Sequence, residues 1–284
     1  MPDTIDCEKL AISLGLAYRD ATDTEVAELR AELDRILTDD SVPRASADAL
    51  DRWERGWGEI LARVKRDGVS ETSLAPQYFR HTMMRLAGRY IRAKSTDFEP
   101  RLYHAIKDRL FREYLSGASH IVEIGCGTGL NLLQLRGLFP KVRLTGADWA
   151  RPSQELVAMI PGTSAVRFDM RSLEGREGLA IDPESAVVTF HAMEQLGDDF
   201  GPLLDFFIEA RPRLVLHLEP IAELYDPAIP FDGAALAYHR KRGYLDGYLE
   251  ALKTRSALNI LKIQRLEFGT PFHEAYSLIV WRPA

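Results

Sequence analysis

Hydrophobic and polar positions follow two different patterns along the chain, and the change falls near residue 116. Before this point, apolar side chains recur at every third or fourth position, which is the spacing of amphipathic helices. After it, short apolar runs alternate with amphipathic segments of helix length. This alternation predicts an α/β fold in which a mostly parallel sheet carries helices on both faces.

The first 115 residues are predicted to be helical, with no strand among them. Thr22 and Glu25 have the spacing of a capping box and precede an apolar stripe over 26–36. Three further helices are expected over 47–68, 76–93 and 100–115. We expect region 1–115 to form a lid or accessory layer on one α/β core, or to build a homodimer through its tryptophans.

The second region, 116–284, is predicted to contain the sheet. Its five buried strands are expected over 120–125, 142–148, 164–170, 185–191 and 213–219. Two β-rich runs over 258–269 and 273–283 then predict an antiparallel hairpin at the sheet edge. Between them and the fifth strand, segment 232–254 is expected to form a helix that is interrupted near Gly243.

Composition narrows the class of protein. The formal net charge of the 284 residues is −6, which argues against a general nucleic-acid or membrane-surface binder. Cys7 and Cys126 lie too far apart to suggest a disulfide framework or a metal site. The amino-terminal residues do not have the pattern of a secretory signal, and no apolar stretch has the length of a membrane helix. We therefore expect a cytoplasmic protein that binds neither nucleic acid nor membranes.

The segment "VEIGCGTGLN" places Gly125, Gly127 and Gly129 between a strand and a helix. Glycine there lets a ligand approach the backbone, and the helix start offers free N–H groups. The spacing does not fit the G-x-G-x-x-G pattern of dinucleotide sites, and no P-loop lysine follows. With Glu123 in front, the segment resembles motif I of the class I S-adenosylmethionine-dependent methyltransferases.

The resemblance covers about 116–284 and implies a Rossmann-like methyltransferase sheet with S-adenosylmethionine as the cofactor. In that family an acid after the second strand binds the ribose, and Asp148 stands there. A helix cap is the other interpretation of Asp148. Asp169, with Met170, matches the acid after the third strand. The predicted cofactor-binding residues are Glu123, Gly125, Gly127, Gly129, Asp148, Trp149, Asp169, Met170 and His191.

Polar residues after the fourth and fifth strands are predicted to serve the methyl acceptor. The predicted catalytic residues are Glu219, Glu194, His217 and His191, and the predicted substrate-binding residues are Glu219, Glu194, Tyr225 and Tyr238. Several carboxylates favour a cationic acceptor, because guanidinium and ammonium groups need counter-charges. The arrangement is weakly similar to arginine methyltransferases, although the glutamates do not share one loop and there is no room for that family's C-terminal β-barrel.

The favoured acceptor is therefore an amine or guanidine nitrogen of a small molecule, such as an arginine-like compound or a natural-product precursor. One alternative is an O-methyltransferase with a histidine as general base, drawn from His191, His217 and His239. Another is a regulatory protein that binds the cofactor without turnover. For His217 the structural interpretation, a hydrogen-bonded histidine in the core, also stays open.

Overall fold

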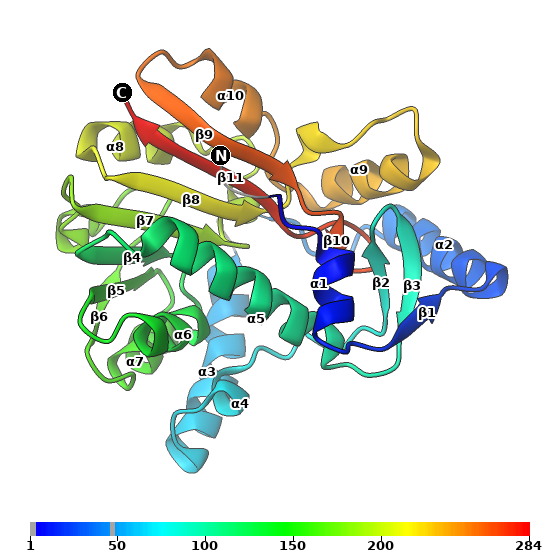
Figure 1. Ribbon diagram of the computed structural model, residues 1–284, viewed down its shortest axis with the longest axis horizontal. Coiled ribbons are helices and arrows are strands. Elements are labelled where there is room, and N and C mark those ends of the chain that lie inside the picture. Colours follow the sequence, from blue (N-terminus) through cyan, green and yellow to red (C-terminus); the bar gives the residue numbers. More distant parts are fainter. Residues whose placement is uncertain (1–3, 46–48) are drawn as a thin grey trace.

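A large mixed sheet forms the centre of the computed structural model, which describes residues 4–45 and 49–284 (Figure 1). Its strand order is β6-β5-β4-β7-β8-β11-β9. The strands are β4 (His120–Ile124), β5 (Arg143–Asp148), β6 (Thr163–Arg167), β7 (Ser185–Phe190), β8 (Leu214–Glu219), β9 (Leu258–Arg265) and β11 (Ser277–Pro283). The first five are parallel, and β11 runs antiparallel between β8 and β9. The predicted α/β sheet and its C-terminal antiparallel pair are confirmed.

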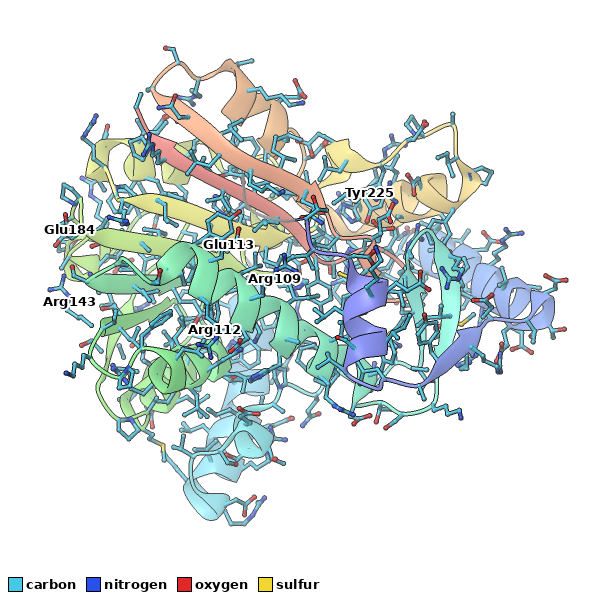
Figure 2. All side chains as sticks on the ribbon, in the orientation of Figure 1. Arg109, Arg112, Glu113, Arg143, Glu184 and Tyr225 are labelled. Atoms are coloured by element: carbon cyan, nitrogen blue, oxygen red, sulfur yellow. The ribbon has the colours of Figure 1, made fainter. Side chains whose placement is uncertain are left out.

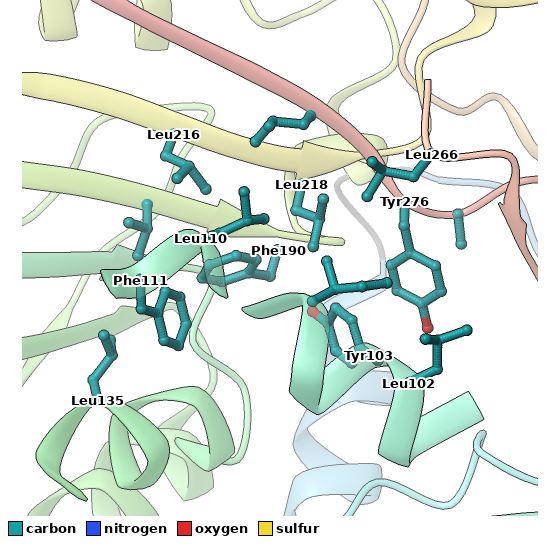
Figure 3. Packing of buried hydrophobic residues seen from close by; sticks show 14 of the residues in the cluster. Leu102, Tyr103, Leu110, Phe111, Leu135, Phe190, Leu216, Leu218, Leu266 and Tyr276 are labelled. Carbon is teal, nitrogen blue, oxygen red and sulfur yellow. The ribbon is translucent and has the colours of Figure 1, made fainter. Parts of the chain in front are cut away.

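Helices cover both faces of this sheet, and each face has its own apolar core. The helices after the strands are α6 (Leu130–Leu138), α7 (Arg151–Ala158), α8 (Gly201–Ala210), α9 (Pro230–Arg242) and α10 (Tyr248–Thr254). Preceding the sheet, α5 (Phe98–Leu110) continues into a π-helical turn at Phe111–Leu115. Figure 3 shows how Leu110, Phe111 and Leu135 meet the strand residues Phe190, Leu216 and Leu218 on one face. The strands β4, β7 and β8 are buried along their whole length, which explains why most of their residues are apolar.

The amino-terminal region is not helical throughout, so that part of the prediction is wrong. It contains α1 (Cys7–Ser13), β1 (Tyr18–Asp20), α2 (Asp23–Thr38), α3 (Leu50–Asp67), α4 (Glu71–Leu74), β2 (Met83–Leu86) and β3 (Arg89–Ala93). Segment 76–93, expected to be a helix, instead forms the β2–β3 hairpin. Its turn residues Ala87 and Gly88 both have positive φ, at 49° and 75°, as a tight hairpin turn requires.

The other predicted helices of this region are found. Thr22 and Glu25 form the expected capping box at the start of α2. The helix α3 ends at Gly68 as predicted, while its expected first residues, 47 and 48, lie outside the described residues. The predicted break near Gly243 is also confirmed, since Gly243 ends α9 with φ at 62° before α10 begins.

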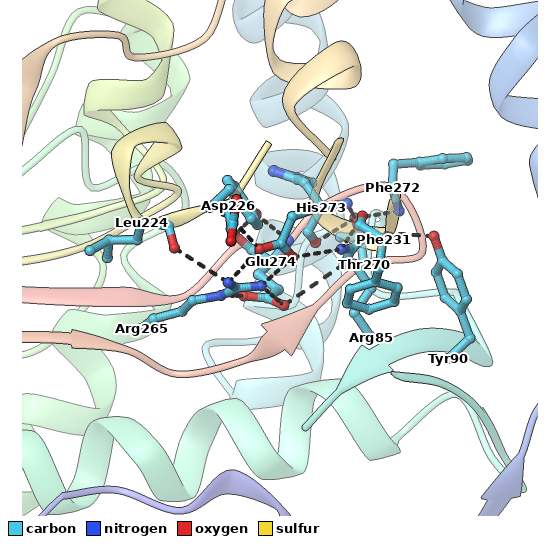
Figure 4. A network of polar contacts seen from close by, with 12 residues as sticks. Arg85, Tyr90, Leu224, Asp226, Phe231, Arg265, Thr270, Phe272, His273 and Glu274 are labelled. Carbon is cyan, nitrogen blue, oxygen red and sulfur yellow. Dashed lines mark hydrogen bonds and ion pairs between the residues drawn. The ribbon is translucent and has the colours of Figure 1, made fainter. Parts of the chain in front are cut away.

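A second sheet connects the two ends of the chain. Its strand order is β1-β3-β2-β10, and β10 (Phe268–Gly269) lies in the connection between β9 and β11. A buried ion-pair network supports this junction (Figure 4). Arg265 binds Asp232 at 2.6 Å and Glu274 at 2.6 Å, and Arg85 of β2 donates to the carbonyl oxygen of Phe231 at 2.7 Å. Region 1–115 is therefore joined to the second region through shared strand pairing and buried charges.

The amino and carboxyl ends of the strands in the large sheet differ in their chemistry. Figure 2 shows Arg143 and Glu184 where strands begin, and Tyr225 beyond the place where they end. At the amino ends, Arg143 lies 3.6 Å from Asp182 and is exposed to solvent. The glycine turn and both cavities described below lie at the carboxyl ends of the strands, where parallel sheets bind ligands. No helix among the described residues combines the length and apolarity that crossing a membrane requires.

Candidate functional site

The glycine turn brings the backbone of β4 against the neighbouring strand ends. Gly125, Gly127 and Gly129 all have positive φ, at 68°, 51° and 77°. A Cβ on Gly125 would overlap the Cβ of Ala192, so this position has no room for a side chain. A Cβ on Gly127 would point at the ring of Trp57, 3.0 Å away. The turn thus lets α3 approach closely. Gly125 lines both of the cavities described below, and Gly127 lines the larger one.

Asp148, at the end of β5, fixes this turn. Its carboxylate accepts hydrogen bonds from the backbone N–H of Gly127 and of Ala150, each at 2.9 Å. Burial raises the pKa of Asp148 to about 6, and these N–H donors oppose the rise. The side chain also lines the smaller cavity. Its oxygens could therefore accept hydrogen bonds from the hydroxyl groups of a ribose bound there, as the prediction for Asp148 requires.

The smaller cavity, of about 70 Å³, gathers most of the predicted cofactor residues. Its lining includes Trp53, Trp57, Gly125, Asp148, Trp149, Phe168, Asp169, Met170, Arg171, His191, Ala192, Gln195 and Leu196. Asp169 accepts from the backbone N–H of Arg171 and from the hydroxyl of Ser172, both at 2.9 Å. Aromatic and thioether walls beside two carboxylates suit an adenosine, whose base is apolar on its faces and polar at its edge.

The larger cavity, of about 530 Å³, adjoins the smaller one. Trp53, Trp57, Gly125, His191 and Gln195 line both. The two tryptophans belong to α3, which therefore borders both cavities. The helix α3 is attached to α7 by a hydrogen bond from the backbone N–H of Arg151 to the carboxylate of Glu54, at 2.9 Å. The two tryptophans therefore support the predicted lid, whereas the homodimer stays a prediction.

Glu123 presents a free oxygen to the larger cavity. Its Oε1 accepts from Asn131 at 2.6 Å, and Asn131 in turn accepts from Lys107 at 2.6 Å. The other oxygen, Oε2, is buried and has no hydrogen-bond partner. Burial raises the pKa of Glu123 to about 7 and lowers that of Lys107 to about 8. Lys107 was not predicted, because nothing in its helical segment distinguishes it from a surface lysine.

His191 lies at the boundary of the two cavities. Its backbone is in the left-handed region, with φ at 54°, which is unusual for a residue other than glycine and is found at functional sites. Nδ1 lies 3.8 Å from Glu194 Oε2, and Nε2 is buried without a partner. Burial lowers the pKa of His191, but Glu194 and other nearby carboxylates outweigh it, so that the pKa lies above its ordinary value.

Glu219 does not reach either cavity, contrary to the prediction that it binds the acceptor. It is fully buried, and it accepts from the backbone N–H groups of Ala192, Met193 and Glu194 at 3.0, 3.2 and 3.4 Å. Burial raises the pKa of this carboxyl to about 7. Its role in the structure is to hold the turn that carries His191 and Glu194.

The structure also gives no support to catalysis by His217 or to substrate binding by Tyr225. The ring of His217 is enclosed by Thr189, Tyr248 and Trp281, at 2.8, 2.7 and 3.0 Å. The hydroxyl of Tyr225 donates to the carbonyl oxygen of Glu274 and accepts from the N–H of the same residue. Both side chains are buried outside the linings of the two cavities, and their polar atoms form hydrogen bonds within the core. The interpretation of His217 as a core histidine is the one that these contacts favour.

Tyr238 lines the larger cavity as predicted, together with residues that the sequence did not indicate. They include Glu32, Arg52, Glu99 and Arg242. These side chains come from α2, α3, α5 and the end of α9, so only the folded chain brings them together. His239, another histidine considered as a base, is buried and bonds His273 at 3.0 Å.

Comparisons with known proteins agree with this site. No protein-family model matches the chain. It is 30% identical over 107 residues to a malonyl-[acyl-carrier protein] O-methyltransferase of Bacillus anthracis, covering 37% of this chain and 39% of that protein. It is 34% identical over 95 residues to a trans-aconitate 2-methyltransferase of Paracidovorax citrulli, covering 30% and 36%. The chain thus spans about two fifths of the length of these curated relatives.

Solved structures show more distant likenesses. The plantazolicin methyltransferase BpumL is 12% identical with a TM-score of 0.46, covering 92% of this chain and 99% of its own. The 16S rRNA methylase ArmA is 12% identical with a TM-score of 0.47, covering 80% and 98%. At this distance neither carries an argument about substrate.

Three observations bear on the family of this chain. The sheet has five parallel strands followed by an antiparallel pair. The glycine turn lies at the carboxyl ends of its parallel strands, where Glu123 lines the larger cavity and Asp148 lines the smaller one. Both curated relatives are methyltransferases. These features agree with the resemblance of residues 116–284 to the class I S-adenosylmethionine-dependent methyltransferases.

Proposed function

We propose that this chain transfers a methyl group from S-adenosylmethionine to an oxygen atom of a small molecule in the larger cavity. The observation that carries the proposal is the position of His191. Among the described residues that line both cavities, it is the one with a titratable side chain, and its Nε2 has no partner. A base is therefore available between the predicted donor site and the predicted acceptor site.

The residues present fit the cofactor. The residues that line the smaller cavity would contact the adenosine, with Asp148 and Asp169 as hydrogen-bond acceptors and Phe168 and Met170 as apolar walls. The unpartnered Oε2 of Glu123 would receive an ammonium group of the amino-acid portion. When bound, the cofactor supplies an activated methyl group on a sulfonium. What the protein must add is orientation of the acceptor and removal of its proton.

His191 has the geometry for that proton transfer. Nδ1 faces Glu194, whose negative charge stabilises the ring once it has taken up a proton. Glu219 accepts hydrogen bonds from three backbone N–H groups of the turn that carries His191 and Glu194. The turn is thus held in place while the side chains of His191 and Glu194 stay available. Such a base contributes about 10²–10⁴-fold to the rate of a proton-transfer step.

A nitrogen acceptor is the second candidate, favoured by the carboxylates of the larger cavity. Glu32, Glu99 and Glu194 line it, and each could face an ammonium or guanidinium group. Glu219 and Tyr225, on which this hypothesis also depended, have their polar atoms engaged in the core. One relative is named an O-methyltransferase and the other acts on trans-aconitate by its name, which supports the oxygen acceptor.

Two experiments test the proposal. Calorimetric titration with S-adenosylhomocysteine measures cofactor binding, and an absence of binding would reject the proposed function. Incubation with a methyl-labelled cofactor and separate pools of carboxylic acids, phenols, amines and guanidines then identifies the acceptor atom. Label on nitrogen compounds alone would favour the second candidate. Cofactor binding with no label in any pool would favour the regulatory alternative.

The variant His191→Gln addresses the mechanism. We expect kcat to fall by about 10²-fold or more, while S-adenosylhomocysteine still binds. Glu194→Gln should lower kcat less and shift its acidic limb to lower pH, because the ring loses the carboxylate that raises its pKa. A His191→Gln variant with the wild-type rate on every acceptor would contradict the role of this base.

A further inference from the structure

Two arginines meet at the larger cavity without a carboxylate to neutralise them. Arg52 comes from α3 and Arg242 is the last residue of α9, and both line the cavity. Within residues 4–45 and 49–284, neither forms an ion pair with an acidic side chain. Each also has a buried nitrogen without a hydrogen-bond partner, Nη2 in Arg52 and Nε in Arg242. These two nitrogens are therefore free to donate to a ligand.

Aromatic rings orient these guanidinium groups but do not cancel their charge. Arg242 donates to the hydroxyl of Tyr238 at 3.1 Å, and its Cζ lies 5.0 Å from the centre of the Tyr244 ring. The Cζ of Arg52 lies 5.7 Å from the ring centre of Trp53. A guanidinium held against an aromatic face keeps its edge donors available, and these donors match the two oxygens of a carboxylate.

The pair is also electrostatically unfavourable when nothing is bound. Burial lowers the pKa of Arg52, and the positive charge of Arg242 lowers it further, so the two groups act on each other. Glu194 is the acidic side chain that faces Arg242, but it accepts from Gln195 at 3.0 Å and faces His191 as well. An anion between the arginines would remove the repulsion and satisfy the buried N–H groups.

We propose that Arg52 and Arg242 bind a carboxylate of the methyl acceptor, so that the acceptors of this protein are acidic small molecules. This inference rests on the proposed function, because it takes the larger cavity as the acceptor site. The cofactor carries a carboxylate of its own, which is the other source of the same chemistry. The two sources are separated by measuring the binding of each ligand by itself.

The test is calorimetric titration of citrate, a tricarboxylate probe, into protein saturated with S-adenosylhomocysteine, at about 150 mM salt to screen weak surface attraction. We expect citrate to bind and trimethyl citrate, its uncharged ester, not to bind. Arg52→Gln and Arg242→Gln should each weaken citrate about ten-fold or more and leave the affinity for S-adenosylhomocysteine within two-fold.

Arg55→Gln and Arg240→Gln are the matched controls. Both arginines are exposed, lie on the same two helices and do not line the cavity, and each substitution removes the same charge. We expect the controls to bind citrate within two-fold of wild type. An equal loss in the controls would show general attraction to the surface and would overturn the proposal.

Three other results would overturn it. Citrate that fails to bind the wild-type complex removes the anion site and leaves cofactor binding intact. Weakened S-adenosylhomocysteine binding in Arg52→Gln or Arg242→Gln, with citrate unaffected, assigns the arginines to the cofactor carboxylate. Wild-type protein that does not bind S-adenosylhomocysteine rejects the proposed function itself, and the acceptor assignment falls with it.

Discussion

His217 allows a quantitative test of whether a buried histidine serves the fold or the chemistry. The indole N–H of Trp281 can only donate, so Nε2 of His217 accepts from it at 3.0 Å, and the hydroxyl of Tyr248 lies 2.7 Å from the same atom. His217→Leu leaves both donors without an acceptor in the core. Each unsatisfied group costs about 1–3 kcal/mol, so we expect the free energy of unfolding at pH 7 to fall by about 2–5 kcal/mol.

The pH dependence of this loss is the sharper part of the prediction. Burial lowers the pKa of His217 to about 3 in the folded protein, whereas the ordinary value in an unfolded chain is about 6.5. Below pH 6.5 the unfolded chain takes up a proton that the folded protein does not, so the contribution of this group is lost as the pH falls. Between pH 7 and pH 5 the wild type loses about 2 kcal/mol through this group. The leucine variant has no such proton to take up, so its deficit shrinks by about 2 kcal/mol.

Urea unfolding at pH 7 and pH 5, followed by circular dichroism, measures both quantities. Tyr248→Phe is the control, because it removes one of the two donors to His217. In a protein that already carries Tyr248→Phe, His217→Leu should lower the free energy of unfolding by less than it does in the wild type. A deficit that stays constant between the two pH values would refute the buried neutral ring. Wild-type stability together with lost methyl transfer would instead restore a catalytic role for His217.

Three further substitutions test other parts of the site. Asp148→Asn should weaken S-adenosylhomocysteine by about ten-fold, measured by calorimetry, because the amide offers one acceptor oxygen instead of two; unchanged affinity would contradict the predicted ribose contact. Gly129→Ala should lower the free energy of unfolding by about 1–3 kcal/mol, given φ at 77° and a Cβ only 2.7 Å from Ile160. Gly137→Ala in α6, where a Cβ meets nothing within 4 Å, should not lower it. Tyr225→Phe should keep kcat within two-fold in the labelled-methyl assay, and a larger loss would return this residue to the acceptor site.

The proximity of the predicted cofactor residues could be inferred from the sequence because these residues follow strand ends in chain order. The turn at Gly125 and the acids Asp148 and Asp169 occupy fixed places relative to neighbouring strands. In a parallel sheet these places meet at one edge, so local pattern is sufficient to bring them together. The smaller cavity confirms that they share one lining.

The lining of the larger cavity could not be predicted in the same way. Arg52 and Arg242 are 190 positions apart, and their helical stripes do not indicate that they meet. The position of Glu219 in the core was not foreseen, because a carboxylate at a strand end can either face a site or accept hydrogen bonds from backbone N–H groups. The β2–β3 hairpin was missed because the spacing of its apolar residues fits a helix as well as a strand. In addition, the outer edge of β2 pairs with β10, which is far away in the sequence.

The pairing of β10 with β2 also has a consequence for how the protein is made. Phe268 is opposite Leu86, which leaves the ribosome 182 residues earlier. During synthesis the β2–β3 hairpin therefore waits with an unpaired edge while the central sheet is still being translated. The segment that completes this edge carries Thr270, Phe272 and His273, which line the larger cavity. The larger cavity is thus closed by a segment that emerges more than a hundred residues after the glycine turn, so a nascent chain has residues 125–129 long before this cavity has all of its walls.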